Sequence, residues 1–170
     1  MPERQPWFER RFTFELSNTL FTNVVERVRG TPARLEERVR GVPTAVLTRR
    51  VNETWSIQEN AGHLLDLEPL WLTRAEELAA GQRELAAADL QNRKTHEANH
   101  NARPLDGLLE AFRQARARFV TRLDAADDAL LARHALHPRL HTPMRLIDLA
   151  LFVAEHDDHH LARISELLKG

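Results

Sequence analysis

Apolar residues recur every three or four positions along four long segments of the chain. This spacing places them on one face of an α-helix, and it predicts a helical protein throughout. The first such face consists of Phe21, Val24, Val28, Leu35 and Val39. Thr31-Pro32 interrupts this segment with a residue pair typical of a helix start. We therefore expect one kinked helix or two abutting helices that end near residues 41–43.

The second segment carries clear helix-boundary signals. Ser56 and Glu59 have the spacing of a capping box, in which each side chain binds a free backbone N–H of the first turn. Gly81 is a suitable residue to follow the helix end. Pro69 lies inside the helix and removes the hydrogen bond to the Leu65 carbonyl, so we expect a kink or bulge there.

Two further helices complete the set. The third follows Pro104, and its buried stripe consists of Leu108, Phe112, Ala115, Phe119 and Leu123. We expect Arg113, Arg116 and Arg118 to lie mostly on its outer side. The fourth begins near Pro143 and extends almost to Gly170.

These helices predict an all-α fold, a four-helix bundle formed by a single domain over residues 1–170. Only the stretch "TAVLT" at 44–48 has a pattern that suits a strand. The connections 41–55, 82–103 and 125–142 are longer than the roughly 2–8 residues that join adjacent antiparallel helices. At least one connection should therefore cross the bundle, and some should cover a site.

Composition excludes several classes of partner and site. The chain has 24 Lys and Arg against 25 Asp and Glu, which argues against general binding of nucleic acid or of anionic membranes. No apolar run approaches the roughly 18–20 residues of a membrane span, and the first residues lack a secretory signal, so we expect a cytoplasmic protein. Cysteine is absent, so a metal site must use His, Asp or Glu, and thiol chemistry must use a thiol from another molecule.

The stretch "AEHDDHHLARI" at 154–164 concentrates three histidines within the fourth helix. At 100° per residue, His156 and His160 lie in the middle of its apolar face, whereas Asp158 points towards solvent and His159 lies on the flank. Two histidines one turn apart can converge on one metal ion. They can equally be core histidines that hydrogen bond to neighbouring helices, and the spacing leaves both alternatives open.

A third metal ligand would have to come from another helix. His63 is the best candidate, since it lies at the edge of the inward face of the second helix beside Asn60. We expect the remaining candidates to be residues near the metal or contacts to substrate. They are His159, Asp157, Asn60, Asn99 and His100.

Each of these candidates also has a structural interpretation. His159 suits the surface, Asp157 suits an exposed helix side, and the pair His96 and His100 suits a loop. Trp55 and Trp71 fit packing better than binding. His134, His137 and His141 fit a connector, and no cluster of Arg or Lys indicates a second substrate.

The segments "WSIQENAGHLLDLEPLWLTR" and "EHDDHHLARI" together resemble the DinB/YfiT-like superfamily, and the resemblance covers nearly the whole chain. It implies a bundle in up-down-down-up order with a long crossover after the second helix. It also implies that His63, His156 and His160 hold a divalent metal ion, which is nickel, zinc, iron or manganese in members of the family. A homodimer is a further expectation.

Three protein ligands leave positions on a metal open for water or substrate, which is the arrangement of a catalytic site. The resemblance favours a thiol S-transferase that uses a low-molecular-weight thiol such as bacillithiol or mycothiol. The first alternative is a metal-dependent hydrolase. The second is a non-enzymatic metal-binding protein of a stress response.

Overall fold

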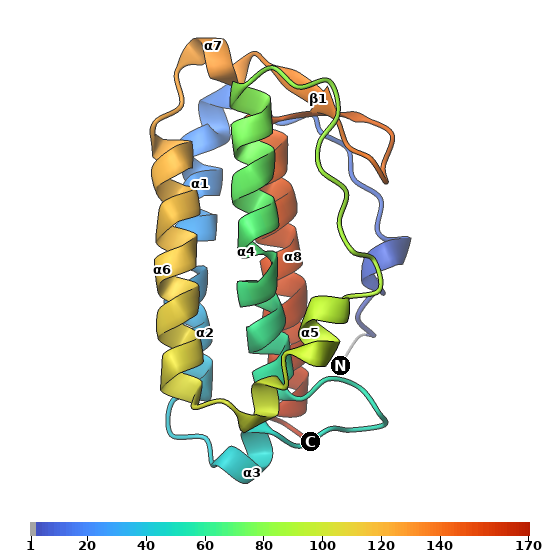
Figure 1. The fold of residues 1–170 in the computed structure, drawn as a ribbon, viewed down its shortest axis with the longest axis vertical. Coiled ribbons are helices and arrows are strands. Elements are labelled where there is room, and N and C mark those ends of the chain that lie inside the picture. The colour runs from blue at the N-terminus through green and yellow to red at the C-terminus, as the bar shows by residue number, and fades with distance from the viewer. Residues whose placement is uncertain (1–2) are drawn as a thin grey trace.

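Four long helical units lie side by side and form a bundle (Figure 1). The computed structural model describes residues 3–170, so Met1 and Pro2 of the expected 1–170 domain lie outside the described residues. The units are α1 (Phe21–Arg29) continued by α2 (Thr31–Val39), α4 (Ile57–Ala79), α6 (Leu105–Asp124) and α8 (Leu146–Leu167). The predicted all-α four-helix bundle is confirmed. Within residues 3–170, no helix is both long enough and apolar enough to cross a membrane.

The first helical unit is divided at the position that Thr31-Pro32 predicts. Gly30 ends α1, and its N–H donates to the carbonyl of Glu26. Pro32 lies in the first turn of α2, where a missing N–H costs no intrahelical hydrogen bond. The unit is therefore two abutting helices.

The capping signals of α4 are also correct. The Ser56 hydroxyl accepts a bond from the Glu59 backbone N–H at 3.1 Å, and the Glu59 carboxylate accepts one from the Ser56 N–H at 2.9 Å. The helix continues through Pro69, so the bond removed by the ring does not end it. Gly81, with φ of +73°, follows the helix end in the left-handed conformation that glycine tolerates best.

Two local predictions were wrong. Residues Thr44–Leu47 form one turn of helix, α3, rather than a strand, because Pro43 begins the turn and its carbonyl accepts the N–H of Leu47. A two-stranded hairpin, β1 (His134–Leu136) and β2 (Pro143–Arg145), lies in the third connection. Strands of three residues are too short to show an alternating pattern.

The remaining elements are short helical turns in the connections. They are η1 (Trp7–Glu9), η2 (Asn18–Leu20), α5 (Arg93–Glu97), η3 (His100–Ala102) and α7 (Asp128–Leu131).

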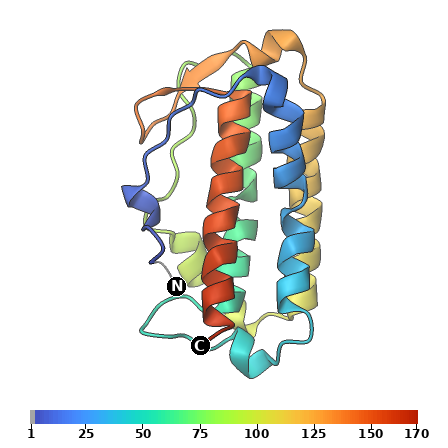
Figure 2. The same ribbon diagram turned by 180° about the vertical axis from the view of Figure 1, so that it is seen from behind.

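The long connection between α4 and α6 runs the length of the bundle. In Figure 1 α4 ends at the top, and the chain then descends outside the bundle through α5 to the start of α6 at the bottom. The N-terminal segment lies on this same side of the bundle in both views (Figure 2). Connecting segments therefore gather over the face formed by α4 and α8.

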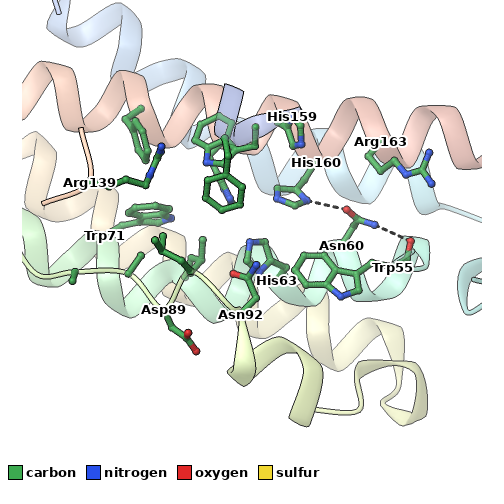
Figure 3. A pocket seen from close by; sticks show the side chains of 18 of the residues that line it. Trp55, Asn60, His63, Trp71, Asp89, Asn92, Arg139, His159, His160 and Arg163 are labelled. Atoms are coloured by element: carbon green, nitrogen blue, oxygen red, sulfur yellow. Dashed lines mark hydrogen bonds between the residues drawn. The ribbon is translucent and has the colours of Figure 1, made fainter. Parts of the chain in front are cut away.

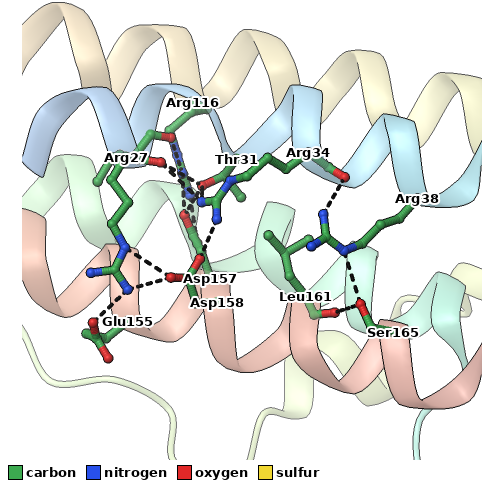
Figure 4. Close-up of polar contacts among 11 residues, drawn as sticks. Arg27, Thr31, Arg34, Arg38, Arg116, Glu155, Asp157, Asp158, Leu161 and Ser165 are labelled. Carbon is green, nitrogen blue, oxygen red and sulfur yellow. Dashed lines mark hydrogen bonds and ion pairs between the residues drawn. The ribbon is translucent and has the colours of Figure 1, made fainter.

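A layer of charged and polar side chains divides the apolar core into two clusters. Each helical unit contributes one or more of these residues, with an apolar residue about one turn away on either side. The layer consists of Thr31 of α2, Glu68 of α4, Arg116 of α6 and Asp157 of α8 (Figure 4). Apolar clusters on both sides exclude water from it.

Two of these positions correct the sequence predictions. Arg116 is 1% exposed and Asp157 is fully buried, whereas the sequence favours an outer position for Arg116 and an exposed helix side for Asp157. Arg116 Nη1 donates to Asp157 Oδ2 at 2.6 Å, and its Nη2 donates to Glu68 at 2.6 Å. Arg116 follows Phe112 by one turn and so shares its inward face. The two carboxylates compensate its charge, which makes this burial possible.

Candidate metal centre

Three histidines from two helices converge beside the polar layer. His63 comes from α4, whereas His156 and His160 come from α8 one turn apart. One nitrogen of each lies within 4.8 Å of one nitrogen of the other two, and all three side chains are buried. Figure 3 shows His63 and His160 facing each other across the cavity wall. The structure thus brings together the three residues proposed as ligands from the sequence.

The orientation of His63 is determined by a polar residue of α5. Its Nδ1 lies 2.9 Å from the Thr95 hydroxyl, and this hydroxyl donates to the Asp66 carboxylate at 2.9 Å. Because the single hydroxyl proton is used for Asp66, the Thr95 oxygen accepts the proton of His63 Nδ1. Nε2 of His63 therefore carries a free lone pair. Thr95 lies in a polar run without an apolar face, so no sequence pattern indicates its role.

Asn60 has the same role towards His160. Its side-chain NH₂ donates to the carbonyls of Trp55 and Ser56, so its Oδ1 faces His160 Nδ1 at 2.9 Å (Figure 3). His160 Nδ1 must be the donor to that oxygen, and Nε2 of His160 is left with a free lone pair. This contact places Asn60 beside the three histidines.

Within residues 3–170, His156 is the one of the three histidines whose ring nitrogen Nδ1 lacks a hydrogen bond. Its Nδ1 is buried and has no hydrogen-bond partner among the described residues. Trp7 and Trp71 pack against the ring edge-to-face, with centroid separations of 5.0 and 5.7 Å. A buried nitrogen without a hydrogen-bond partner costs about 1–3 kcal/mol, and a ligand bound to this nitrogen would remove that cost.

All three imidazoles are neutral at neutral pH. Burial lowers the pKa of His63 to about 4, and it lowers the pKa values of His156 and His160 well below the ordinary value. The neutral imidazole is the form that binds metal ions. Two directed lone pairs, one unsatisfied buried nitrogen and three neutral rings fit a single divalent ion with nitrogen ligands.

A cavity of about 840 Å³ opens beside the three histidines. The N-terminal segment and all three long connections line it, the connections through residues 53–55, the stretch 87–92 and the loop 137–141 of the hairpin. Trp7, Trp55 and Trp71 all line this cavity, and Trp71 also packs in the apolar core. Four arginines also line it, which the sequence did not indicate: Arg4, Arg74, Arg139 and Arg163.

The other residues proposed from the sequence differ in their position relative to the cavity. His159 lines the cavity, and Arg4 Nη1 lies 2.6 Å from its Nε2. Asp157 is bonded to Arg116 and Thr31 rather than to a histidine. Asp158, expected in solvent, is half-buried in ion pairs with Arg27 and Arg34.

His100 and Asn99 do not line the cavity as expected of substrate contacts. The His100 ring is buried against Gly62 of α4, and its Nε2 lies 2.8 Å from Asp66. Asn99 is exposed. His96 is also exposed and contacts the Trp55 ring at a centroid separation of 5.5 Å.

Comparisons with known proteins give two findings. The sequence model of the DinB superfamily matches residues 27–164. The structure is similar to that of YfiT from Bacillus subtilis, described as "a probable metal-dependent hydrolase with an unusual four-helix bundle topology". The TM-score is 0.81 at 20% sequence identity, over 95% of this chain and 93% of YfiT, which shows a shared fold. No curated protein sequence matches the chain.

Proposed function

Because the chain belongs to the DinB superfamily, we propose that it is a metal-dependent enzyme and that His63, His156 and His160 hold one divalent ion. The observation that carries this proposal is the convergence of three buried, neutral imidazole nitrogens within 4.8 Å at the wall of a cavity. Nickel, zinc, iron and manganese remain the candidate ions, because an all-histidine donor set suits several first-row metals.

When bound, the ion supplies Lewis acidity that lowers the pKa of a small nucleophile at its open position. The protein supplies the rest. Thr95 and Asn60 orient two imidazole rings, and such contacts typically change metal affinity by about 10–100-fold. Trp7 and Trp55 cover the rings from the cavity side and limit the access of water.

We propose a low-molecular-weight thiol as the nucleophile and an electrophilic small molecule as its partner. The thiol sulfur forms a bond to the electrophilic carbon, the leaving group departs, and the thiol proton passes to solvent. The carboxylates nearest in sequence to the ligands are already engaged. The partners are Thr95 and His100 for Asp66, Arg10 and Arg27 for Glu155, Arg116 for Asp157, and Arg27 and Arg34 for Asp158. A general base is therefore lacking among them, and attack by a thiol with a lowered pKa does not need one.

Hydrolysis is the second candidate. The description of YfiT as a probable metal-dependent hydrolase favours it, since the two proteins share a fold. For this activity a group in the cavity would have to accept a proton from water. His159, whose pKa is lowered to about 4 mainly by burial, is a weak base for that purpose.

The two candidates are separated by a turnover assay. The purified protein is supplied with each metal and with bacillithiol, mycothiol, glutathione or cysteine, and 1-chloro-2,4-dinitrobenzene serves as electrophile. Metal-dependent release of chloride with one thiol supports the transferase, provided that His63→Ala abolishes it and His96→Ala does not. Absence of turnover with every thiol removes this proposal.

Hydrolysis of an ester or amide panel without thiol would support the hydrolase instead. Metal retention without any turnover would support the non-enzymatic stress-response alternative. The homodimer, the cytoplasmic location and the single-domain organisation stay predictions.

A further inference from the structure

Arg74 lines the cavity as a buried cation without a directly paired carboxylate in residues 3–170. It is 1% exposed, and no described carboxylate forms an ion pair with it. Its Nε donates to the carbonyl of Ala86 at 2.9 Å, and its Nη1 faces His137 at 3.2 Å. Burial lowers the pKa of Arg74 to about 10, with Glu77 offsetting part of this effect, so the guanidinium remains charged. A buried cation of this kind is costly unless an anion accompanies it.

His137 does not satisfy Arg74. The backbone N–H groups of Arg139 and Leu140 both point at His137 Nδ1, at 3.2 and 3.1 Å, so Nδ1 must be the acceptor. The proton of the neutral ring is then on Nε2. Nε2–H and the Arg74 Nη1–H are two donors that face each other at 3.2 Å without an acceptor. An oxygen placed beside them would accept a bond from each.

A second cation lies close by. Arg139 lines the same cavity as Arg74, and its backbone N–H donates to Nδ1 of the same His137 ring whose Nε2 faces Arg74. Arg139 lies over the Phe8 ring at 5.3 Å and forms no ion pair with a described carboxylate. By contrast, Arg4 and Arg163, which line the cavity elsewhere, both pair with Glu166. Only the end with Arg74 and Arg139 combines two cavity arginines without carboxylate partners among the described residues.

An aromatic wall connects this end to the three histidines. The Trp71 ring lies 5.7 Å from the His156 ring and 5.6 Å from the Arg74 guanidinium carbon. His63 and Arg74 share one face of α4, since eleven residues make three turns and about 16 Å. Figure 3 shows Arg139 and Trp71 at one end of the cavity, with His63 and His160 further along it.

We propose that Arg74, His137 and Arg139 form a subsite for the carboxylate of a small substrate. An apolar portion of this substrate packs on Trp71, and its reacting atom reaches the three histidines. This assignment rests on the proposed function and names the class of molecule that the same site accepts. The molecule is a carboxylic acid whose apolar spacer is about as long as the indole ring of Trp71.

The test uses two matched probes on the full chain, 3-phenylpropanoate and its neutral amide 3-phenylpropanamide. All three tryptophans of the protein line the cavity, so quenching of their fluorescence reports binding there. We expect the carboxylate to bind about tenfold or more tightly than the amide, since charge-assisted bonds are roughly twice as strong as neutral ones. Arg139→Gln and Arg74→Gln should remove this preference, and Arg163→Gln should retain it.

Arg139 is only half-buried, so Arg139→Gln keeps the test valid if Arg74→Gln fails to fold. The titrations are made first on protein freed of metal with EDTA. The preference must persist there, which separates this subsite from the metal. Equal binding of acid and amide would overturn the subsite. So would a preference that appears only with metal, or one that Arg163→Gln removes as fully as Arg139→Gln. Failure of the proposed function would instead appear as absent metal binding with the preference intact.

Discussion

Arg116 Nη1 lies 2.6 Å from Asp157 Oδ2, and this buried ion pair joins α6 to α8 at the residue that follows His156 (Figure 4). Asp157 follows His156 in the sequence, so the two side chains leave α8 about 100° apart. The ion pair holds Asp157 towards α6 and α2, and this rotation of α8 turns His156 towards α4. Burial alone would lower the pKa of Arg116, but the charges of Asp157 and Glu68 raise it above its ordinary value.

Loss of this cation should destabilise the protein strongly. Arg116→Ala leaves Asp157 and Glu68 buried without a counter-charge, and breaking a buried pair in this way costs about 3–5 kcal/mol. Arg113→Ala is the matched control, because its ion pairs with Glu36 and Glu110 are partly exposed and such pairs contribute about 0–1 kcal/mol. Urea denaturation measures both. Similar losses of the free energy of unfolding in the two variants would show that the buried ion pairs of Arg116 stabilise the protein no more than the partly exposed pairs of Arg113.

Thr95 should matter to metal binding although it cannot bind the ion itself. Thr95→Val keeps the shape of the side chain and removes the oxygen that accepts from His63 Nδ1. We expect metal affinity to fall by about 10–100-fold with little change in the fold. Thr121→Val, on the exposed side of α6, is the control and should bind metal normally. Competition titration with a chromogenic chelator measures this, and unchanged affinity in Thr95→Val would refute the positioning role.

Gly62 should not tolerate a side chain. A Cβ at this position would lie 2.3 Å from ring atoms of the buried His100, so the connection that carries His100 would have to move. We expect Gly62→Ala to lower the free energy of unfolding by about 1–3 kcal/mol. Gly107, in the first turns of α6, has no heavy atom within 4 Å of the added Cβ. Gly107→Ala should instead stabilise the protein by about 0.4–1 kcal/mol, and a stable Gly62→Ala would contradict the close packing.

Acid should destabilise the protein partly through His137. Burial and, to a smaller extent, the positive charges of Arg74, Arg139 and His141 lower the pKa of His137 to about 4. The unfolded chain therefore takes up this proton at a higher pH than the folded chain does. The stability that depends on neutral His137 is complete above about pH 6.5 and is lost as the pH falls towards 4.

His137→Gln removes this titration and keeps a hydrogen-bond acceptor. The free energy of unfolding should fall less steeply in this variant over pH 6.5 to 4, by at most about 1.4 kcal/mol per pH unit. Denaturation curves at several pH values give both slopes. Identical slopes would show that His137 titrates alike in both states.

The helical fold could be predicted because each long helix carries its own signal. The capping box at Ser56 and Glu59 begins α4 at the expected residue, and Thr31-Pro32 marks the break between α1 and α2. The hairpin β1–β2 could not be predicted from the sequence, because it depends on contacts between distant segments. The Leu136 N–H donates to the carbonyl of Arg83, and the Leu85 N–H to the carbonyl of Leu136, across a separation that no local pattern encodes.

The candidate site likewise contains residues that the sequence predicts and residues that it does not. His156 and His160 share a helix face, so their convergence follows from helical phase. His63 could be proposed from its place at the edge of the inward face of α4, and the family motif supported it. Thr95 and Arg139 come from connections, where the fold alone decides which side chain reaches the cavity. The burial of Arg116 could not be predicted, because the two carboxylates that compensate its charge come from other helices.

The most direct test of the account is the metal content of the purified protein, measured by elemental analysis. The account predicts about one divalent ion per chain in the wild type and large losses in His63→Ala, His156→Ala and His160→Ala. His96→Ala and His159→Ala should remain near the wild-type value, with each variant's fold checked by circular dichroism. Equal metal content in all five folded variants, or none in the wild type after supplementation, would contradict the three-histidine centre.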